Sequence, residues 1–255
     1  MTHREFPNKA LCAEPVFYRT YSRKESDKRE SFQELVDRVS YGLYTVGSLS
    51  SDEYNLVKEY LLQLKAFPSG RWLWVGGTNW VQNPENYLGA FNCASLNLNK
   101  PHYFGLLAYM AMQGTGTGAV LEQKYISNLP VVKNRLKYKC YKQPGALSKE
   151  ERLETTYVNL RHNYAYIYVG DSKEGWRDVY QILIDLAFGD NFKEQNKVIE
   201  VEVDFSSVRS KGEKLKGFGG VANPNMLPEQ LRKVCEVLNR ANHRKLNSEE
   251  CCLLI

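Results

Sequence analysis

Two N-terminal segments place their apolar residues at helical spacing. Residues 30–43 carry apolar side chains three and four positions apart, with charged residues on the opposite face. Residues 51–64 repeat the pattern, and Ser51 and Asp52 offer the helix cap. The stripe expected to be buried in this second helix comprises Tyr54, Leu56, Val57, Tyr60, Leu61 and Leu64. Residues 1–24 are polar and are expected to form an extended, docked arm.

Beyond these helices, strands and helices are predicted to alternate. The short apolar run at 71–75 is expected to be a strand, and a loop over 76–90 leads to a strand that carries Cys93. A buried helix over 102–112 and a further strand over 119–125 follow. Such alternation is typical of an α/β architecture.

The second half of the chain continues this alternation. Period-two patterns predict strands over 164–169 and 198–205, and apolar runs predict helices over 177–188 and 228–241. A long loop rich in glycine and lysine separates the last strand from the last helix, over 206–225. The whole pattern predicts an α/β protein with either a wound sheet or a barrel.

Composition limits the classes of protein and partner. The chain has 255 residues, of which 43% are hydrophobic and 25% charged, as in ordinary globular proteins. A net charge of +5 fits an enzyme of anionic small molecules but is too weak to predict nucleic-acid binding. No stretch approaches the length of a membrane span, and the N-terminus lacks an apolar signal core. We therefore expect neither a nucleic acid nor a membrane as partner.

The cysteines favour a reducing compartment. They stand at positions 12, 93, 140, 235, 251 and 252, without a C-x-x-C pair and without histidine at metal-ligand spacing. Neither a disulfide framework nor a metal site is expected, and the cytoplasm is the default location.

Cys93 is the most informative residue. It lies in FNCASLNL, with the glycine-rich RWLWVGGT before it and QGTGTGAVLE after it. A free cysteine often packs as a small hydrophobic residue. Beside flexible loops that can cradle phosphate, however, a thiol suggests redox or radical chemistry on a nucleotide. The glycines at 114, 116 and 118 would serve a tight turn equally well.

The C-terminal residues SEECCLLI end in an apolar run. They match a C-terminal prenylation pattern at Cys252, but no polybasic stretch precedes it. We favour an element that is completed by another polypeptide.

Six motifs, taken together, carry a family resemblance. In order they are PVFYRTYSRK, PSGRWLWVGGT, NCASLNL, MQGTGTGAVLEQKYI, GDSKEGW and FSSVRSKGEKLKGFGG. From about residue 15 onward the chain resembles the N-terminal part of a monomeric, adenosylcobalamin-dependent (class II) ribonucleoside-triphosphate reductase. Each motif alone is weak, but their common order is specific.

The resemblance implies a fold and a division of the chain. The family fold is a ten-stranded α/β barrel with a central finger loop that carries a radical cysteine, and this chain would form about half of it. The implied parts are an N-terminal arm and helical region (1–68), the first part of the barrel with Cys93 (69–126), an insertion forming the effector site (127–200) and a barrel continuation with the Gly/Lys loop (201–255).

The resemblance also assigns substrate-side roles. Cys93 matches the N-terminal member of a reducing cysteine pair, whose closure to a disulfide supplies two electrons. The residues matched to substrate contacts are Ser69, Asn92, Ser95, Gly114 and Gly116. Ordinary turn or strand roles remain an alternative for these residues.

A second set of residues matches the effector side. Asp171 and Ser172 would hold the ribose hydroxyl and phosphate of a deoxynucleoside triphosphate effector, although a helix-cap role is equally open. The segment 214–225 resembles a mobile loop between the effector and substrate sites. The basic and glycine residues expected to serve that loop are Arg209, Lys211, Lys214, Lys216, Gly217, Gly219 and Gly220. One departure from the family pattern is Ala222-Asn223-Pro224, where Ala-Ser-Gly-Pro is usual.

The family's remaining chemistry would lie beyond Ile255. We expect a C-terminal half on a separate chain to supply the radical cysteine, the second reducing cysteine and most contacts to adenosylcobalamin. A ribonucleotide substrate and a thioredoxin-like reductant complete the expected partners. The alternative is a catalytically inactive nucleotide-binding or regulatory module related to the reductase.

Overall fold

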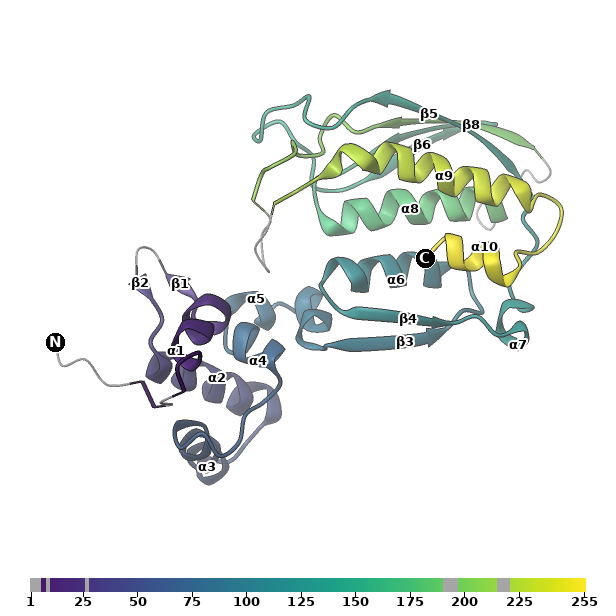
Figure 1. The fold of residues 1–255 in the computed structure, drawn as a ribbon. Helices are drawn as coiled ribbons and strands as arrows, with labels where there is room; N and C mark the ends of the chain where they lie inside the picture. Colours follow the sequence, from purple (N-terminus) through teal and green to yellow (C-terminus); the bar gives the residue numbers. More distant parts are fainter. Residues whose placement is uncertain (1–5, 8–9, 26–27, 190–196, 215–220) are drawn as a thin grey trace. The chain divides into compact units, whose positions relative to one another are not determined.

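The chain forms two compact units in the computed structural model, residues 1–92 and residues 93–255. The boundary between them falls immediately before Cys93. The structure describes residues 6–7, 10–25, 28–189, 197–214 and 221–255 (Figure 1).

The N-terminal unit is helical. Its β1 (Lys24–Glu25) and β2 (Lys28–Arg29) form a short antiparallel pair. Its helical segments are α1 (Ala13–Val16), a π-helical turn (Phe17–Tyr21), α2 (Phe32–Gly47), α3 (Ser51–Leu62), α4 (Gly70–Val75), α5 (Asn79–Gln82) and a 3-10 turn (Pro84–Ala90). Both predicted amphipathic helices are thus confirmed, as α2 and α3.

The cap predicted for α3 is wrong by one residue. Ser50, rather than Ser51 or Asp52, accepts the backbone N–H of Glu53 at 3.3 Å, and the Glu53 carboxylate accepts the N–H of Ser50 at 2.8 Å. This reciprocal arrangement satisfies two backbone donors at once. The predicted stripe is also too wide, because only Leu61 is buried, whereas Leu56 is 50% exposed.

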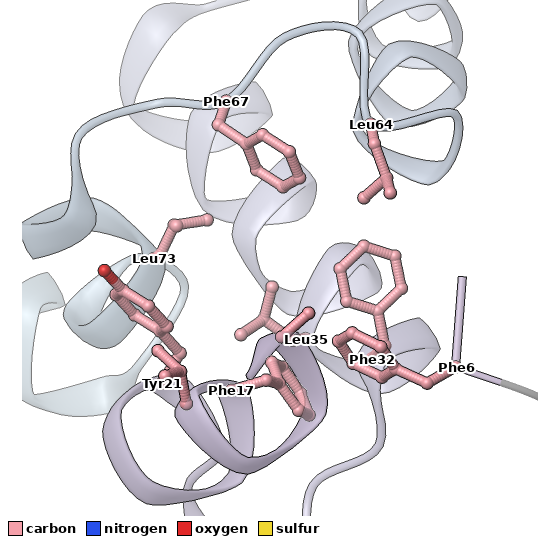
Figure 2. Close-up of a pocket in the computed structure, with 10 residues that line it drawn as sticks. Phe6, Phe17, Tyr21, Phe32, Leu35, Leu64, Phe67 and Leu73 are labelled. Atoms are coloured by element: carbon pink, nitrogen blue, oxygen red, sulfur yellow. The ribbon is translucent and has the colours of Figure 1, made fainter. Parts of the chain in front are cut away.

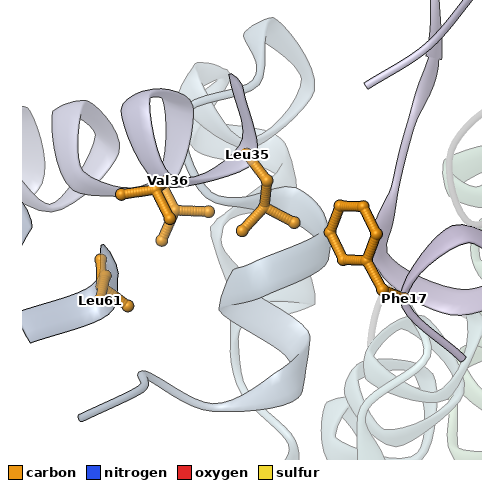
Figure 3. Close-up of a cluster of buried hydrophobic side chains, with 5 residues drawn as sticks. Phe17, Leu35, Val36 and Leu61 are labelled. Carbon is orange, nitrogen blue, oxygen red and sulfur yellow. The ribbon is translucent and has the colours of Figure 1, made fainter. Parts of the chain in front are cut away.

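The predicted extended arm is helical between residues 13 and 21. Phe17 explains the difference, because its ring is buried in a cluster with Leu35, Val36, Val39 and Leu61, which are drawn together in Figure 3. A helical turn lets this segment direct an aromatic side chain onto α2.

The strand predicted at 71–75 is also wrong, because these residues form α4. The Ser69 side chain accepts the backbone N–H of Trp72 at 3.2 Å and so begins a helix where a turn was expected. A short apolar run does not distinguish strand from helix by its period. The loop predicted over 76–90 likewise contains α5, which is capped by Thr78.

The C-terminal unit begins with a β–α–β arrangement. Strands β3 (Cys93–Asn97) and β4 (Gly116–Val120) pair in parallel, and α6 (His102–Met112) connects them. The predicted Cys93 strand and the helix over 102–112 are confirmed. The strand predicted over 119–125 begins earlier and ends at Val120, and its second half is wrong because α7 (Gln123–Ile126) follows.

A four-stranded sheet forms the rest of this unit, with α8 (Lys173–Phe188) and α9 (Leu227–Arg240) packed against one face (Figure 1). The strands are β5 (Arg135–Lys142), β6 (Tyr157–Arg161), β7 (Tyr164–Tyr168) and β8 (Val198–Asp204), in the order β5-β8-β7-β6. Only the β6–β7 pair is antiparallel. A 3-10 turn (Pro224–Met226) precedes α9, and α10 (Ser248–Leu253) follows it.

These elements confirm the mixed α/β class. The predicted strands at 164–169 and 198–205 correspond to β7 and β8, and the predicted helices at 177–188 and 228–241 to α8 and α9. The hydrophobic core of the sheet lies on the face that α8 and α9 cover, with Ile167, Val201 and Val203 fully buried. Within the described part of the chain, no helix is long and apolar enough to cross a bilayer.

Candidate functional site

Cys93 is an exposed, free thiol at the start of β3. Along β3, Cys93, Ser95 and Asn97 are exposed, whereas Ala94 and Leu96 are half-buried. Alternate side chains of a strand share a face, so Cys93 and Ser95 project from the same side. An exposed thiol in this place does not serve as a packing residue of the core.

The neighbouring strand leaves the space beside this thiol open. Cys93 pairs in register with Gly116, and Ser95 pairs with Gly118. Glycine has no side chain, so the surface next to Cys93 is backbone, which a ligand can approach closely. The third glycine, Gly114, has φ of +78° and lies just beyond the end of α6. Gly114 therefore forms the tight turn that the sequence analysis gave as the alternative to a phosphate-binding role.

Ser69 and Asn92 belong to the N-terminal unit. Ser69 is exposed and caps α4, as described above, and Asn92 is the exposed residue that precedes Cys93 in the chain. The β3–β4 pair therefore brings together Cys93, Ser95 and Gly116. The substrate-side roles of these three and of Ser69, Asn92 and Gly114 stay predictions.

A largely buried ion pair that no sequence pattern indicated fixes the end of α4 and the glycines that follow it, in the segment RWLWVGGT. The Arg38 guanidinium binds both carboxylate oxygens of Glu30, at 2.7 and 2.8 Å, and these side chains are only 11% and 10% exposed. The same guanidinium donates to the backbone carbonyls of Leu73, Trp74 and Gly76, near the C-terminal end of α4. Positive charge at a helix C-terminus is favourable, so this pair holds α4 against α2.

The N-terminal unit also contains an apolar cavity of about 340 Å³ (Figure 2). Its lining is Phe6, Ala13, Val16, Phe17, Tyr21, Phe32, Leu35, Leu64, Phe67 and Leu73. The Tyr21 hydroxyl is the one side-chain polar group in this lining. A nucleotide site needs several convergent polar groups, so this cavity does not extend the candidate site.

On the effector side, the structure brings Asp171 and Arg209 together. The Asp171 carboxylate accepts the Arg209 Nε–H at 2.8 Å and its backbone N–H at 3.0 Å. Arg209 also donates to the Asp171 backbone carbonyl at 3.1 Å. In this structure the Asp171 carboxylate is therefore engaged by protein groups.

Ser172 has the helix-cap role that was left open for it. Its hydroxyl accepts the backbone N–H of Gly175 at 2.9 Å and donates to the Glu154 carbonyl at 2.6 Å. Lys211 and Lys214 are exposed. The predictions for Lys216, Gly217, Gly219 and Gly220 lie outside the described residues.

Close backbone packing explains the two glycines of GDSKEGW. A Cβ on Gly170 would lie 2.3 Å from the Glu154 carbonyl oxygen, and one on Gly175 would lie 2.6 Å from the Gly170 carbonyl oxygen. A side chain at Gly170 would push away the segment 154–155, and one at Gly175 would push Gly170 away from the start of α8. The motif therefore holds that segment beside Asp171 and Ser172.

Arg152 and Glu213 join this cluster. Glu213 stands in the last of the six motifs and Arg152 in none, and the sequence predicted a role for neither residue. Arg152 binds both Glu213 oxygens at 2.7 and 2.8 Å, and it lies 3.5 Å from Asp171. This pairing, together with the backbone N–H of Ser210, lowers the pKa of Glu213 to about 2. Four charged side chains, Arg152, Asp171, Arg209 and Glu213, thus form one network, which is called the charged network below.

Comparisons with known proteins show which family this chain resembles. Residues 128–238 match the family model described as "B12-dependent ribonucleotide reductase, insertion domain". A putative adenosylcobalamin-dependent ribonucleoside-triphosphate reductase of Mycobacterium phage D29 is 31% identical, over 94% of this chain and 34% of that protein. The adenosylcobalamin-dependent ribonucleoside-triphosphate reductase of Lactobacillus gasseri is 26% identical, over 94% of this chain and 38% of that protein.

The fold agrees with these relatives. A crystal structure of a B12-dependent (class II) ribonucleotide reductase superposes with a TM-score of 0.71 at 23% identity, covering 95% of this chain and 40% of that one. The chain spans about a third of the length of the curated relatives it matches. The chain is therefore similar, along almost its whole length, to the N-terminal part of B12-dependent ribonucleotide reductases.

Proposed function

We propose that this chain supplies the N-terminal portion of a ribonucleotide reductase that converts ribonucleoside triphosphates to deoxyribonucleotides. The observation that carries the proposal is the exposed Cys93 thiol beside the glycines of β4, in a chain that aligns along 94% of its length with such reductases. A C-terminal portion, on a separate chain, supplies the radical cysteine and the second reducing cysteine.

The chemistry of the paired thiols balances. The C2′–OH bond of the ribose breaks and a C2′–H bond forms, which consumes two electrons and two protons and releases water. Cys93 and the second cysteine give up those two electrons and two protons as their sulfurs join in a disulfide. A thioredoxin-like reductant then restores both thiols. Ser95 and the backbone around Gly116 would position the nucleotide next to Cys93.

The sheet that carries Cys93 supports a larger assembly. Within the described residues, β3 and β4 form a two-stranded parallel sheet. Parallel strands are normally part of larger, covered sheets, because their outer edges otherwise leave backbone groups unpaired. Further strands from the C-terminal portion would pair with these edges.

Adenosylcobalamin would supply the radical when bound. As the family resemblance implies, we assign most cofactor contacts to the C-terminal portion and only the reductant and effector roles to this chain. The effector, a deoxynucleoside triphosphate, would bind at the charged network.

Reconstitution tests the proposal. The chain is mixed with the C-terminal portion of the phage D29 relative, starting where their alignment ends, and the phage protein's own N-terminal portion serves as the control. With adenosylcobalamin, a ribonucleoside triphosphate and a dithiol, we expect deoxynucleotide only when both portions are present. A complex that binds deoxynucleoside triphosphate but forms no product, while the control is active, would favour the regulatory module instead.

A further inference from the structure

The base of the Gly/Lys loop is pinned through Glu213. The loop stem is defined here as residues 210–214 together with 221–222. Within it, Gly212 donates to the Ala222 carbonyl and Ala222 donates to the Glu213 carbonyl, both at 2.8 Å. The Glu213 carboxylate accepts the backbone N–H of Ser210 at 2.7 Å. The position of Glu213 therefore determines how the stem closes.

Arg152, which holds Glu213, is itself firmly placed. It lies in the segment 145–156, which is called the strap here. Two backbone hydrogen bonds join the strap to the segment 206–208. The Gly145 N–H donates to the Val208 carbonyl at 2.7 Å, and the Leu147 N–H donates to the Ser206 carbonyl at 3.1 Å. At its other end, the Leu153 carbonyl accepts the N–H of Asp171 at 2.7 Å. With its side chain only 9% exposed, Arg152 is a fixed cation between the loop stem and the start of α8.

The two carboxylates on Arg152 differ in how easily they can leave. Asp171 is 11% exposed and is held by three bonds to Arg209 through its carboxylate and backbone, whereas Glu213 is 36% exposed. A guanidinium that binds a carboxylate through two parallel N–H groups presents the same fork to a phosphate. Lys211 and Lys214 on the stem are exposed and add positive charge nearby.

We propose that Glu213 is an internal competitor for an anion subsite on Arg152, and that the triphosphate of a nucleotide displaces it and so releases the loop stem. This inference rests on the effector site of the proposed function, because it names Arg152 as a further phosphate-binding residue there. At neutral pH Glu213 is ionised, since its pKa is about 2, so its full negative charge competes with a phosphate for Arg152.

Titration calorimetry with inorganic tripolyphosphate tests the competition on the full chain. Glu213→Gln keeps the shape of the side chain but removes its charge, so we expect tripolyphosphate to bind about tenfold more tightly than to the unchanged protein. Glu150→Gln removes the same charge from an exposed position on the strap and should leave the affinity within about twofold. Equal affinities for Glu213→Gln and the unchanged protein, or no binding to either, would overturn the proposal.

Arg152→Lys and hydrogen exchange test the remaining steps. Lysine keeps the charge but loses the fork, so affinity should fall, and Arg152→Lys/Glu213→Gln should bind no more tightly than Arg152→Lys alone. In the unchanged protein, tripolyphosphate should speed amide exchange at Gly212 and Ala222 at least about fivefold. Binding without faster exchange would overturn the release step. These measurements need no reductase activity, so they can fail while the proposed function holds.

Discussion

Replacing Cys93 with serine in the reconstituted enzyme is expected to abolish deoxynucleotide formation. Serine keeps the size and polarity of the side chain but cannot join a disulfide, so two electrons no longer reach the substrate. The rate should fall by roughly a thousandfold or more, as it does when a covalently acting residue is lost. Cleavage of the cobalt–carbon bond should persist, because that step needs only the cofactor and the radical cysteine.

Cys252→Ser is the matched control. Cys252 is also exposed, but it lies on α10, outside the β3–β4 pair. The control should show near-normal turnover, and both variants should unfold at nearly the same temperature as the unchanged protein, since an exposed Cys-to-Ser change alters little packing. Near-normal turnover in Cys93→Ser would refute its role as reductant. A parallel loss of stability, radical formation and product would indicate a structural residue instead.

Gly42→Ala is expected to destabilise the N-terminal unit. Gly42 lies in α2, and a Cβ there would lie 2.3 Å from the backbone nitrogen and 2.8 Å from the Cα of Gly77. Backbone atoms cannot rotate away, so α2 and the RWLWVGGT turn must separate. We expect the free energy of unfolding of the N-terminal unit to fall by about 1–3 kcal/mol, despite alanine's higher helix propensity.

Gly47→Ala isolates that packing cost, because it makes the same change at the end of the same helix. A Cβ at Gly47 would meet only the Leu49 side chain, at 3.4 Å, which is an ordinary contact. Its unfolding temperature should therefore stay unchanged or rise slightly, whereas that of Gly42→Ala should drop by several degrees. Equal unfolding temperatures for the two variants would contradict the close approach of α2 to the turn.

Local patterns predicted those parts of the fold that depend on neighbouring residues. Leu35, Val36 and Val39 marked the buried face of α2, because helical spacing is visible within a few turns. The strand beginning at Cys93 and the helix α6 were likewise confirmed. The run at 71–75 failed as a strand because its structure depends on the Ser69 cap, which the apolar pattern does not reveal.

Residues of the candidate site could be predicted only where they stand in a motif that resembles the family. Cys93, Asp171, Arg209 and Glu213 stand in motifs with a family resemblance. Arg152 lies outside these motifs, and its pairing with Glu213 spans 61 residues of sequence. A contact of that range follows from the packing of the strap against the loop stem, and no spacing rule along the chain encodes it. Ser172 shows the converse limit, since one residue type suits both a helix cap and a ligand contact.

Disulfide mapping after a single turnover tests the central claim most directly. The reconstituted enzyme, with both portions fully reduced, is given substrate and adenosylcobalamin without an external reductant, and is then quenched in an alkylating reagent. Mass spectrometry should find Cys93 joined to a cysteine of the C-terminal portion, with one disulfide for each deoxynucleotide formed. Deoxynucleotide formed while Cys93 remains fully alkylated would contradict its role as the reducing thiol.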